Sequence, residues 1–350
     1  MQQQLETISD FLVLSGFQYR IFDLGRKIQK ISNQTFAAIE MQQTPYPYPF
    51  QQKAWLAILF WDKQKKQEPV IWFLSFPIDE LGLLKLESRD GFVRDLISNI
   101  GENMQAHLEG GLAKDSLKES PFSFKPREDR LAMFHALATV ELNEQPSQHY
   151  APTQEYLTGK IGFEQWQFLG LQGISDVVAR LDKDDNAATL ANALPNLPDV
   201  PLDRFMQCLE NVRYSGKLSV ALAKRVNEEM KVEEKQPALM ASLVRALSGN
   251  EASSERKRQI REILSSDSRK EVEVLAAISG RAWGDLKEAE LMQLFLEGAA
   301  LQEQEVFNIL LVDLMTIPDM RPKVLVGLRN PNRSVDLIKR IGSFMGGVIS

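Results

Sequence analysis

The chain has 350 residues, of which 44% are hydrophobic and 25% are charged, a composition typical of globular proteins rather than of disordered or membrane-spanning chains. A chain of this length predicts about two domains, and the net charge of -6 argues against a protein that binds nucleic acid over a broad surface. The single cysteine, Cys208, excludes an intramolecular disulfide and a cysteine-rich metal site. Since the amino terminus lacks the basic region and cleavage site of a signal peptide, and no apolar run is long enough to span a membrane, we expect a cytoplasmic protein.

Residues 1–100 predict a small α+β domain, with a mostly antiparallel sheet and helices. It begins with a short helix that Gly16 ends. The segments QYRIFD and RKIQKI follow as a hairpin, in which Gly25 is expected to supply a positive φ at the turn. Ser32 is then positioned to cap a second short helix.

The segment TPYPYPFQQKAWLAILFW, residues 44–61, places alternating prolines and tyrosines before a block of large apolar side chains. Thr44, Tyr46 and Tyr48 each precede a proline, which forces them into an extended conformation. Such a run is either a docking motif or a stiff lead into a buried strand. The apolar block directly after it favours the stiff lead, and Tyr46 and Tyr48 remain candidate partner-binding residues.

Two strands with apolar residues on both faces are predicted at residues 53–61 and 70–76, and both are expected in the centre of the sheet. The charged first hairpin is expected at its edge. A helix at about residues 86–100 would cover one face. Residues 101–127 contain a Gly-Gly pair, two prolines and mixed charge, which predicts a linker between the domains.

Residues 128–350 predict an all-α, HEAT-like or irregular helical-repeat solenoid. EDRLAMFHALATVEL forms one amphipathic helix, and QPSQHYAPTQEYLTGK is interpreted as a polar joint. Beyond it, five apolar anchors recur at spacings of 35, 34, 35 and 36 residues: Ile174, Leu209, Leu243, Ile278 and Leu314. Such periods are typical of stacked helix pairs. The second helices of the pairs are expected at NAATLANAL, GKLSVALAKRV, ERKRQIREIL, EAELMQLFL and PKVLVGL.

Catalytic and metal-binding patterns are scarce. The chain contains three histidines, His107, His135 and His149, and none has a convincing partner for nucleophilic catalysis. No H-E-x-x-H motif and no glycine-rich phosphate loop is present. We therefore predict no catalytic residues, no metal and no cofactor.

The segment DKDDNAATL spaces three oxygen ligands like the start of a calcium loop. However, Ala187 stands where that loop requires glycine, and Ala193 stands where it requires a bidentate glutamate. The segment is interpreted instead as a turn between helices, with Asp185 or Asn186 as the N-cap of the next helix.

The densest basic cluster lies in SERKRQIREIL, where Lys257, Arg258 and Arg261 are expected on the exposed side of a helix. These three residues are candidate partner-binding residues. Glu255 and Glu262 share the same surface, so a solvated helix face is the alternative interpretation.

The segments ISDFLVLSGFQYRIFDLGRKIQKISNQTFAAIE and TPYPYPFQQKAWLAILFW resemble the amino-terminal signature of an uncharacterised gammaproteobacterial family, defined only as a domain of unknown function. The resemblance extends through PREDRLAMFHA and towards the carboxy terminus. It implies a bacterial cytoplasmic protein without a known activity, and it supplies no catalytic or binding residues.

The leading functional hypothesis is a non-enzymatic adaptor or scaffold, because solenoids expose an extended surface to partner proteins. The alternatives are an enzyme of unknown class with its site in a cleft between the domains, or a nucleic-acid-associated factor. An unidentified protein partner is expected, nucleic acid is not, and the sequence leaves the oligomeric state open.

Overall fold

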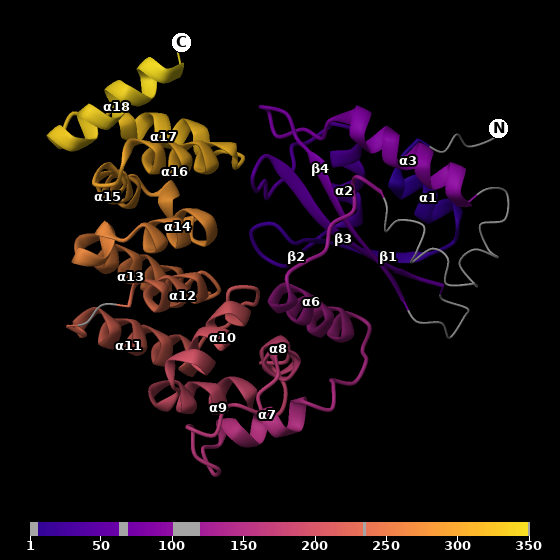
Figure 1. Cartoon of the computed structure of the whole chain (residues 1–350), viewed down its shortest axis with the longest axis horizontal. Helices are drawn as coiled ribbons and strands as arrows, with labels where there is room; N and C mark the ends of the chain where they lie inside the picture. Colours follow the sequence, from indigo (N-terminus) through magenta and orange to yellow (C-terminus); the bar gives the residue numbers. More distant parts are fainter. Residues whose placement is uncertain (1–5, 63–68, 101–119, 234–235, 349–350) are drawn as a thin grey trace. The chain divides into compact units, whose positions relative to one another are not determined.

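The computed structural model describes residues 6–62, 69–100, 120–233 and 236–348 (Figure 1). Contacts between Cα atoms divide the chain into two compact units. Unit 1 comprises Met1–Arg127 and Thr316–Pro318, and unit 2 comprises Glu128–Met315 and Asp319–Ser350. A small antiparallel sheet near the amino terminus and a mostly helical remainder confirm the predicted classes of structure.

The sheet of unit 1 has four strands in the order β2-β1-β3-β4, and all neighbours are antiparallel. The strands are β1 (Gln18–Asp23), β2 (Gln29–Ile31), β3 (Lys53–Trp61) and β4 (Val70–Pro77). The predicted hairpin of β1 and β2 is confirmed. The expected strand order is wrong in part, because β1 lies inside the sheet and β4 is the last strand. An inner position for β1 is possible because Ile21 and Phe22 are buried and the Asp23 carboxylate is hydrogen-bonded.

Residues 122–124, within the segment predicted as a linker, run alongside β4. The Ser75 amide donates to the Phe122 carbonyl oxygen at 2.7 Å, and the Phe124 amide donates to the Phe73 carbonyl oxygen at 3.1 Å. The Phe124 ring also lies 4.9 Å from the Trp55 ring. The apolar side chains of this short stretch therefore pack on the sheet, whereas residues 101–119 of the predicted linker lie outside the described residues.

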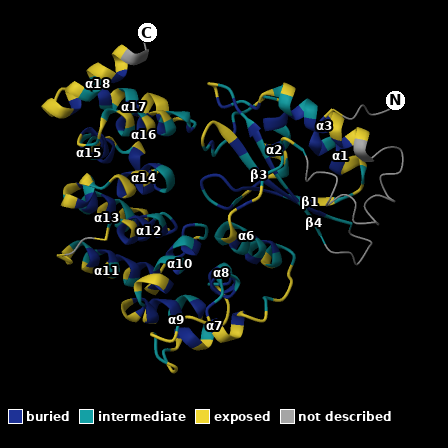
Figure 2. Ribbon diagram, viewed as in Figure 1, coloured by how far each residue is buried: buried dark blue, intermediate teal, exposed yellow. Residues whose placement is uncertain are grey.

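Three helices pack on one face of the sheet: α1 (Ile8–Leu14), α2 (Asn33–Glu40) and α3 (Leu86–Ile100) (Figures 1 and 2). Their shared core includes Phe11, Phe36, Phe92 and the sheet residues Ile58 and Trp72. The predicted cap of α2 is confirmed, since the Thr35 amide donates to the Ser32 hydroxyl at 3.0 Å.

Gly16 follows α1 and Gly25 follows β1, and the two glycines have different structural roles. Gly16 follows α1 with a φ of 75°, as expected for a residue that ends a helix. The positive φ expected at Gly25 is wrong, because Gly25 is not among the residues with positive φ. A Cβ at Gly25 would instead lie 3.1 Å from both Phe50 Cβ and Trp55 Cδ1, so the close approach of these two side chains favours glycine at this position.

Unit 2 is built from α-helices. In chain order they are α6 (Glu128–Glu141), α7 (Tyr150–Leu157), α8 (Leu171–Ala179), α9 (Asn186–Ala193), α10 (Asp199–Leu209), α11 (Lys217–Lys231), α12 (Pro237–Leu247), α13 (Ser253–Ser265), α14 (Val272–Arg281), α15 (Ala289–Ala300), α16 (Gln304–Thr316), α17 (Met320–Leu328) and α18 (Val335–Val348). The five predicted anchors lie in α8, α10, α12, α14 and α16, and all five are fully buried. The predicted second helices correspond to α9, α11, α13, α15 and α17. The polar joint is wrong, since it contains α7, where Tyr156 and Leu157 are buried.

Helices of unit 2 contact one another in two series (Figure 1). In one series α6, α8, α10, α12 and α14 each contact the next, and in the other series α7, α9, α11, α13, α15 and α17 do the same. Helices two apart in the chain are therefore neighbours, and residues about one repeat apart in the sequence come together.

Candidate functional site

Four charged side chains meet at the ends of helices in the first series. Glu210 directly follows α10, Arg245 lies in the last turn of α12, Arg281 closes α14, and Arg130 lies in the first turn of α6. Cations are favourable near the carboxyl end of a helix, which suits Arg245 and Arg281. We call Glu210, Arg130, Arg245 and Arg281 the Glu210 cluster.

Glu210 occupies the centre of this cluster, and its side chain is 7% exposed. Arg130 Nη2 lies 3.5 Å from Glu210 Oε1, whereas Arg245 Nε and Arg281 Nε lie 3.5 and 3.1 Å from Glu210 Oε2. The contact of Arg130 is a hydrogen bond, but Glu210 Oε2 and Arg281 Nε lack aligned hydrogen-bond partners. Charge-assisted hydrogen bonds are usually about 2.7–2.9 Å long, so this carboxylate is shared loosely among three guanidinium groups.

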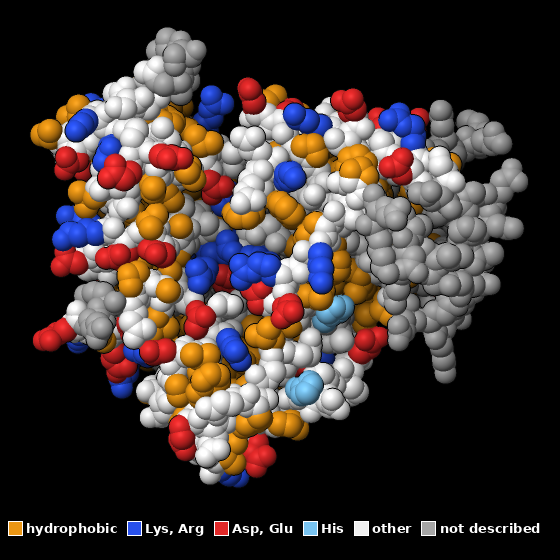
Figure 3. All heavy atoms as spheres, in the orientation of Figure 1, with side chains coloured by type: hydrophobic (Ala, Val, Ile, Leu, Met, Phe, Trp, Pro, Cys, Tyr) orange, Lys and Arg blue, Asp and Glu red, His pale blue; other side chains and the backbone are white. Residues whose placement is uncertain are grey.

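Hydrogen bonds through Ser242 connect the Glu210 cluster to a second carboxylate, that of Asp203. Arg245 Nη2 donates to Ser242 Oγ at 2.6 Å, and Ser242 Oγ donates to Asp203. The arginine side chains keep part of their surface exposed, 29% for Arg245 and 13% for Arg281. On the face of unit 2 that the space-filling view shows, basic and acidic side chains are interspersed (Figure 3). These contacts join three arginine side chains and two carboxylates.

The sequence analysis did not identify these residues. The period of the helix pairs is the signal that could have found them, because Glu210, Arg245 and Arg281 are separated by 35 and 36 residues. Residues at equivalent positions of successive repeats are neighbours when the repeats stack. Arg130 lies before the first anchor and was outside that pattern.

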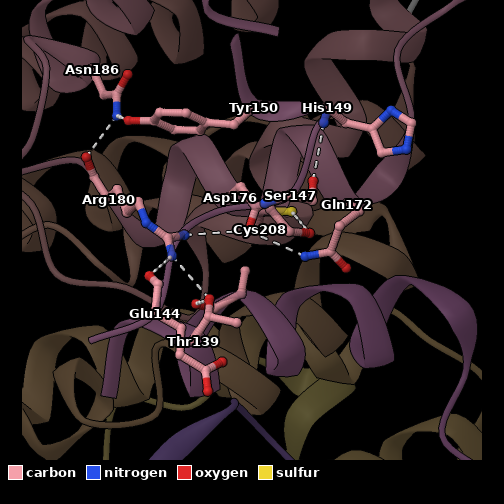
Figure 4. A network of polar contacts seen from close by, with 12 residues as sticks. Thr139, Glu144, Ser147, His149, Tyr150, Gln172, Asp176, Arg180, Asn186 and Cys208 are labelled. Atoms are coloured by element: carbon pink, nitrogen blue, oxygen red, sulfur yellow. Dashed lines mark hydrogen bonds and ion pairs between the residues drawn. The ribbon is translucent and has the colours of Figure 1, made fainter. Parts of the chain in front are cut away.

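A second polar network joins α6, α8 and α9 (Figure 4). Arg180 Nη2 donates to Thr139 Oγ1 at 3.0 Å, and Arg180 Nη1 pairs with Asp176 Oδ1 at 3.3 Å. The buried Asn186 amide donates to the Arg180 carbonyl oxygen at 2.8 Å and to Tyr150 Oη at 2.7 Å. Because these groups satisfy one another within the protein, the network holds neighbouring helices together.

The segment DKDDNAATL contains the turn before α9, which agrees with the predicted turn between helices. Asp185 stands at the N-cap position of α9 with a φ of 58°, although its side chain makes no capping hydrogen bond. Asp184 accepts a hydrogen bond of 2.8 Å from the Tyr150 hydroxyl. Within residues 6–62, 69–100, 120–233 and 236–348, no three His, Cys, Asp or Glu side chains are grouped so that they could hold a metal ion.

Two potentially reactive side chains of unit 2 are shielded from solvent to different extents, since Cys208 is buried and His135 is partly buried. Burial raises the pKa of the Cys208 thiol to about 12, so this thiol is protonated at neutral pH and is a poor nucleophile. Burial lowers the pKa of His135, which keeps its imidazole neutral beside Phe134 in α6. For the part of the chain that the structure describes, no helix is long and apolar enough to cross a membrane.

The predicted basic cluster of Lys257, Arg258 and Arg261 lies on α13, where all three side chains are at least one third exposed. Arg258 pairs with both acids that share its surface. Its Nη2 and Nε donate to Glu255 at 2.5 and 3.0 Å, and its Nη1 donates to Glu262 at 2.5 Å. These aligned contacts raise the pKa of Arg258 above its ordinary value.

Lys257 and Arg261 pair with carboxylates at the start of α15. Lys257 Nζ lies 3.1 Å from Glu288 Oε2, and Arg261 donates to both oxygens of Glu290 at 2.9 Å. Every cation of the predicted cluster thus has a carboxylate close to it. Partner binding by these three residues stays a prediction.

The tyrosines of the proline-rich run have different environments. Tyr46 is fully buried, and its hydroxyl lies 2.6 Å from Asp23 Oδ1 and 3.2 Å from the Trp55 carbonyl oxygen. Tyr48 is half-buried, and its ring lies edge-on to that of Tyr46. Tyr46 would have to leave the core to contact a partner, whereas Tyr48 retains some accessible surface.

Comparison with family models shows a match to DUF3549, described as a protein of unknown function, over residues 3–345. Comparisons with curated proteins and with solved structures found no match. The family match agrees with the resemblance of the amino-terminal segments to a domain of unknown function. Because it covers nearly the whole chain, the chain belongs to the DUF3549 family.

Proposed function

We propose that this protein is a non-enzymatic scaffold, in which unit 2 is a HEAT-like or irregular solenoid that binds a partner protein. The two series of contacts between alternate helices carry this proposal. In a solenoid each helix pair contacts its neighbours in the chain, and the open rows present an extended surface. Such surfaces are used for recognition of other proteins.

The chemistry of the Glu210 cluster supports recognition rather than catalysis. Arginine stays protonated at any physiological pH, so it cannot exchange protons as a general acid or base. Its planar guanidinium group instead presents several donors that match a carboxylate. The cluster brings three of these groups together around Glu210.

The experiment is purification of the full-length chain from its own host, with and without nuclease treatment, followed by reconstitution. Co-purifying proteins are identified by mass spectrometry, produced separately and titrated against the purified chain by calorimetry. We expect at least one protein to bind in a saturable manner with a fixed stoichiometry after nuclease treatment.

Two results would overturn the proposal. If every co-purifying protein is lost on nuclease treatment, the chain is a nucleic-acid-associated factor. If no co-purifying protein binds the purified chain directly, the scaffold function is wrong.

A further inference from the structure

We propose that the chain forms a two-fold symmetric dimer, in which α18 of one copy pairs in antiparallel orientation with α18 of a second copy. Exposed residues line much of this last helix (Figure 2). Three of them have large aliphatic side chains, since Val335 is 82% exposed, Ile338 52% and Met345 41%. Terminal helices of helical stacks normally present a polar outer face, so exposed apolar side chains grouped on one of them are typical of an interaction site.

A different side of α18 is anchored on unit 2. Leu337 and Phe344 are buried, and the Phe344 ring lies 6.2 Å from the Phe307 ring of α16. Arg340 Nε donates to the Ala300 carbonyl oxygen at the end of α15, at 3.2 Å. Because these contacts fix the rotation of the helix about its axis, they also fix which side chains of α18 are turned outwards.

The exposed residues have the spacing of a seam between two paired helices. They recur at intervals of three, four and three positions, and we call them the α18 stripe: Val335, Ile338, Gly342 and Met345. Two helices pack knobs into holes when their facing residues alternate in this way. Apart from the adjoining residues and helix backbone, no atom of the described residues lies within 4 Å of a Cβ placed at Gly342. Packing within the chain thus does not require glycine there, whereas a large side chain of a neighbouring helix would fit against it.

An antiparallel pair centred on Ile338 makes the α18 stripe complementary to itself. In this register Ile338 would contact Ile338 of the second copy, and Val335 would lie against Gly342 of the second copy. The two-fold axis produces the second contact twice, because a residue i that meets j in one direction is met by j in the other. A large side chain therefore faces a small one on both sides of the centre.

The charges beside the α18 stripe are complementary in the same register. Asp336 and Lys339 are exposed, and neither has a salt-bridge partner among the described residues. Asp336 would lie beside Lys339 of the second copy, and the two-fold axis repeats this ion pair. A parallel pair would instead bring identical charges to the same level of the two helices, and an anionic membrane surface would repel Asp336. The charge pattern therefore favours a second copy in antiparallel orientation.

Sedimentation equilibrium of the full-length chain, from about 1 to about 200 µM, measures the dissociation constant of the dimer. We expect a value of about 10 µM, because two short helices make an interface smaller than the standard size. Ile338→Asp places two carboxylates at the centre of the pair and should raise the dissociation constant more than about tenfold. The matched control is Val220→Asp on α11, where Val220 is 71% exposed, and it should change the constant less than about twofold.

Charge exchange tests the register independently of the apolar contacts. Asp336→Lys alone, or Lys339→Glu alone, brings like charges together and should raise the dissociation constant about threefold. The double variant exchanges the two charges and should return the constant to within about twofold of the parent value. A substitution that merely disturbed α18 would not be rescued by the second one. Circular dichroism melts verify that each variant is folded.

Several results would overturn the proposal. They are a parent chain that stays monomeric over the whole range, a dimer that Ile338→Asp leaves unchanged, and a double charge variant as weak as the single ones. The proposal is also overturned if the chain sediments as a monomer with vesicles of phosphatidylglycerol and phosphatidylethanolamine and Ile338→Asp abolishes this binding, because the α18 stripe is then a membrane contact. The dimer does not depend on the scaffold function, which the purification experiment tests separately.

Discussion

The Tyr46 hydroxyl lies 2.6 Å from Asp23 Oδ1 and links the proline-rich run to the end of β1 inside the core of unit 1. Both side chains are fully buried, and burial together with the Asp23 carboxylate raises the pKa of Tyr46 well above its ordinary value. The tyrosine therefore donates its proton to a charged acceptor. The Asp23 carboxylate also accepts hydrogen bonds from the Gly25 and Lys27 amides, so it organises the turn after β1.

We expect Tyr46→Phe to lower the free energy of unfolding by about 1.5–3 kcal/mol, because it removes a hydrogen bond to a buried charged group. Urea unfolding monitored by circular dichroism measures this change. The double variant with Asp23→Asn supplies the control, since the two substitutions should not be additive if the residues interact directly. Additive effects would show that the bond contributes nothing to stability.

Trp72 lies in β4 and packs among aromatic rings of the helices and the sheet. Its ring centroid is 4.6 Å from that of Phe60 and 5.9 Å from those of Phe11 and Phe92, and the residue is 3% exposed. Trp72→Ala should cost about 3–5 kcal/mol through lost burial and a cavity. Trp55→Ala should cost less, because Trp55 is only half-buried. Thermal melts that give the two variants equal stability would contradict this ranking.

Asp285 is 2% exposed and accepts two hydrogen bonds from Arg256 of α13. Asp285→Ala leaves the Arg256 guanidinium group without its buried counter-charge, and we expect a loss of about 3–5 kcal/mol. Glu262→Ala is the matched control, because the pair of Glu262 with Arg258 is exposed and should contribute less than about 1 kcal/mol. Chemical denaturation of both variants measures the difference, and a loss at Asp285 as small as that at Glu262 would argue against a buried ion pair.

Burial of Cys208 makes the stability of the folded chain depend on pH in the alkaline range. Its pKa is raised from 9.0 to about 12, because burial disfavours the thiolate. The folded state then holds the proton more tightly than the unfolded state, so stability falls as pH rises from about 9 towards 12. Cys208→Ala should lose less stability than the parent chain over the range from pH 8 to about 10.5.

Reaction of the native chain with Ellman's reagent provides a second measurement on Cys208. The buried, protonated thiol should react slowly at pH 8 and rapidly after unfolding in urea. Equal rates in the two states would show that the thiol is accessible in the folded state. Parallel pH profiles for the parent and Cys208→Ala chains would show that folding does not raise its pKa.

Much of the local structure could be predicted from periodicity. The spacing of apolar residues predicted β3, β4, α3 and the helix pairs of unit 2, because one buried face imposes a period of two on a strand and of 3.6 on a helix. The same reasoning failed at α7, where polar residues and a proline concealed Tyr156 and Leu157, which are buried.

The sequence by itself determined most of the helices and strands, α7 excepted, and which of their faces are apolar, since both depend on residues a few positions apart. Only the tertiary structure decided that β1 lies inside the sheet, that Tyr46 is buried against Asp23, and that Arg130 and Arg281 meet at Glu210. Strand order and the pairing of charges depend on contacts between residues distant in the chain. Their free energies arise from burial and from the distances between charges, which the order of the residues does not contain.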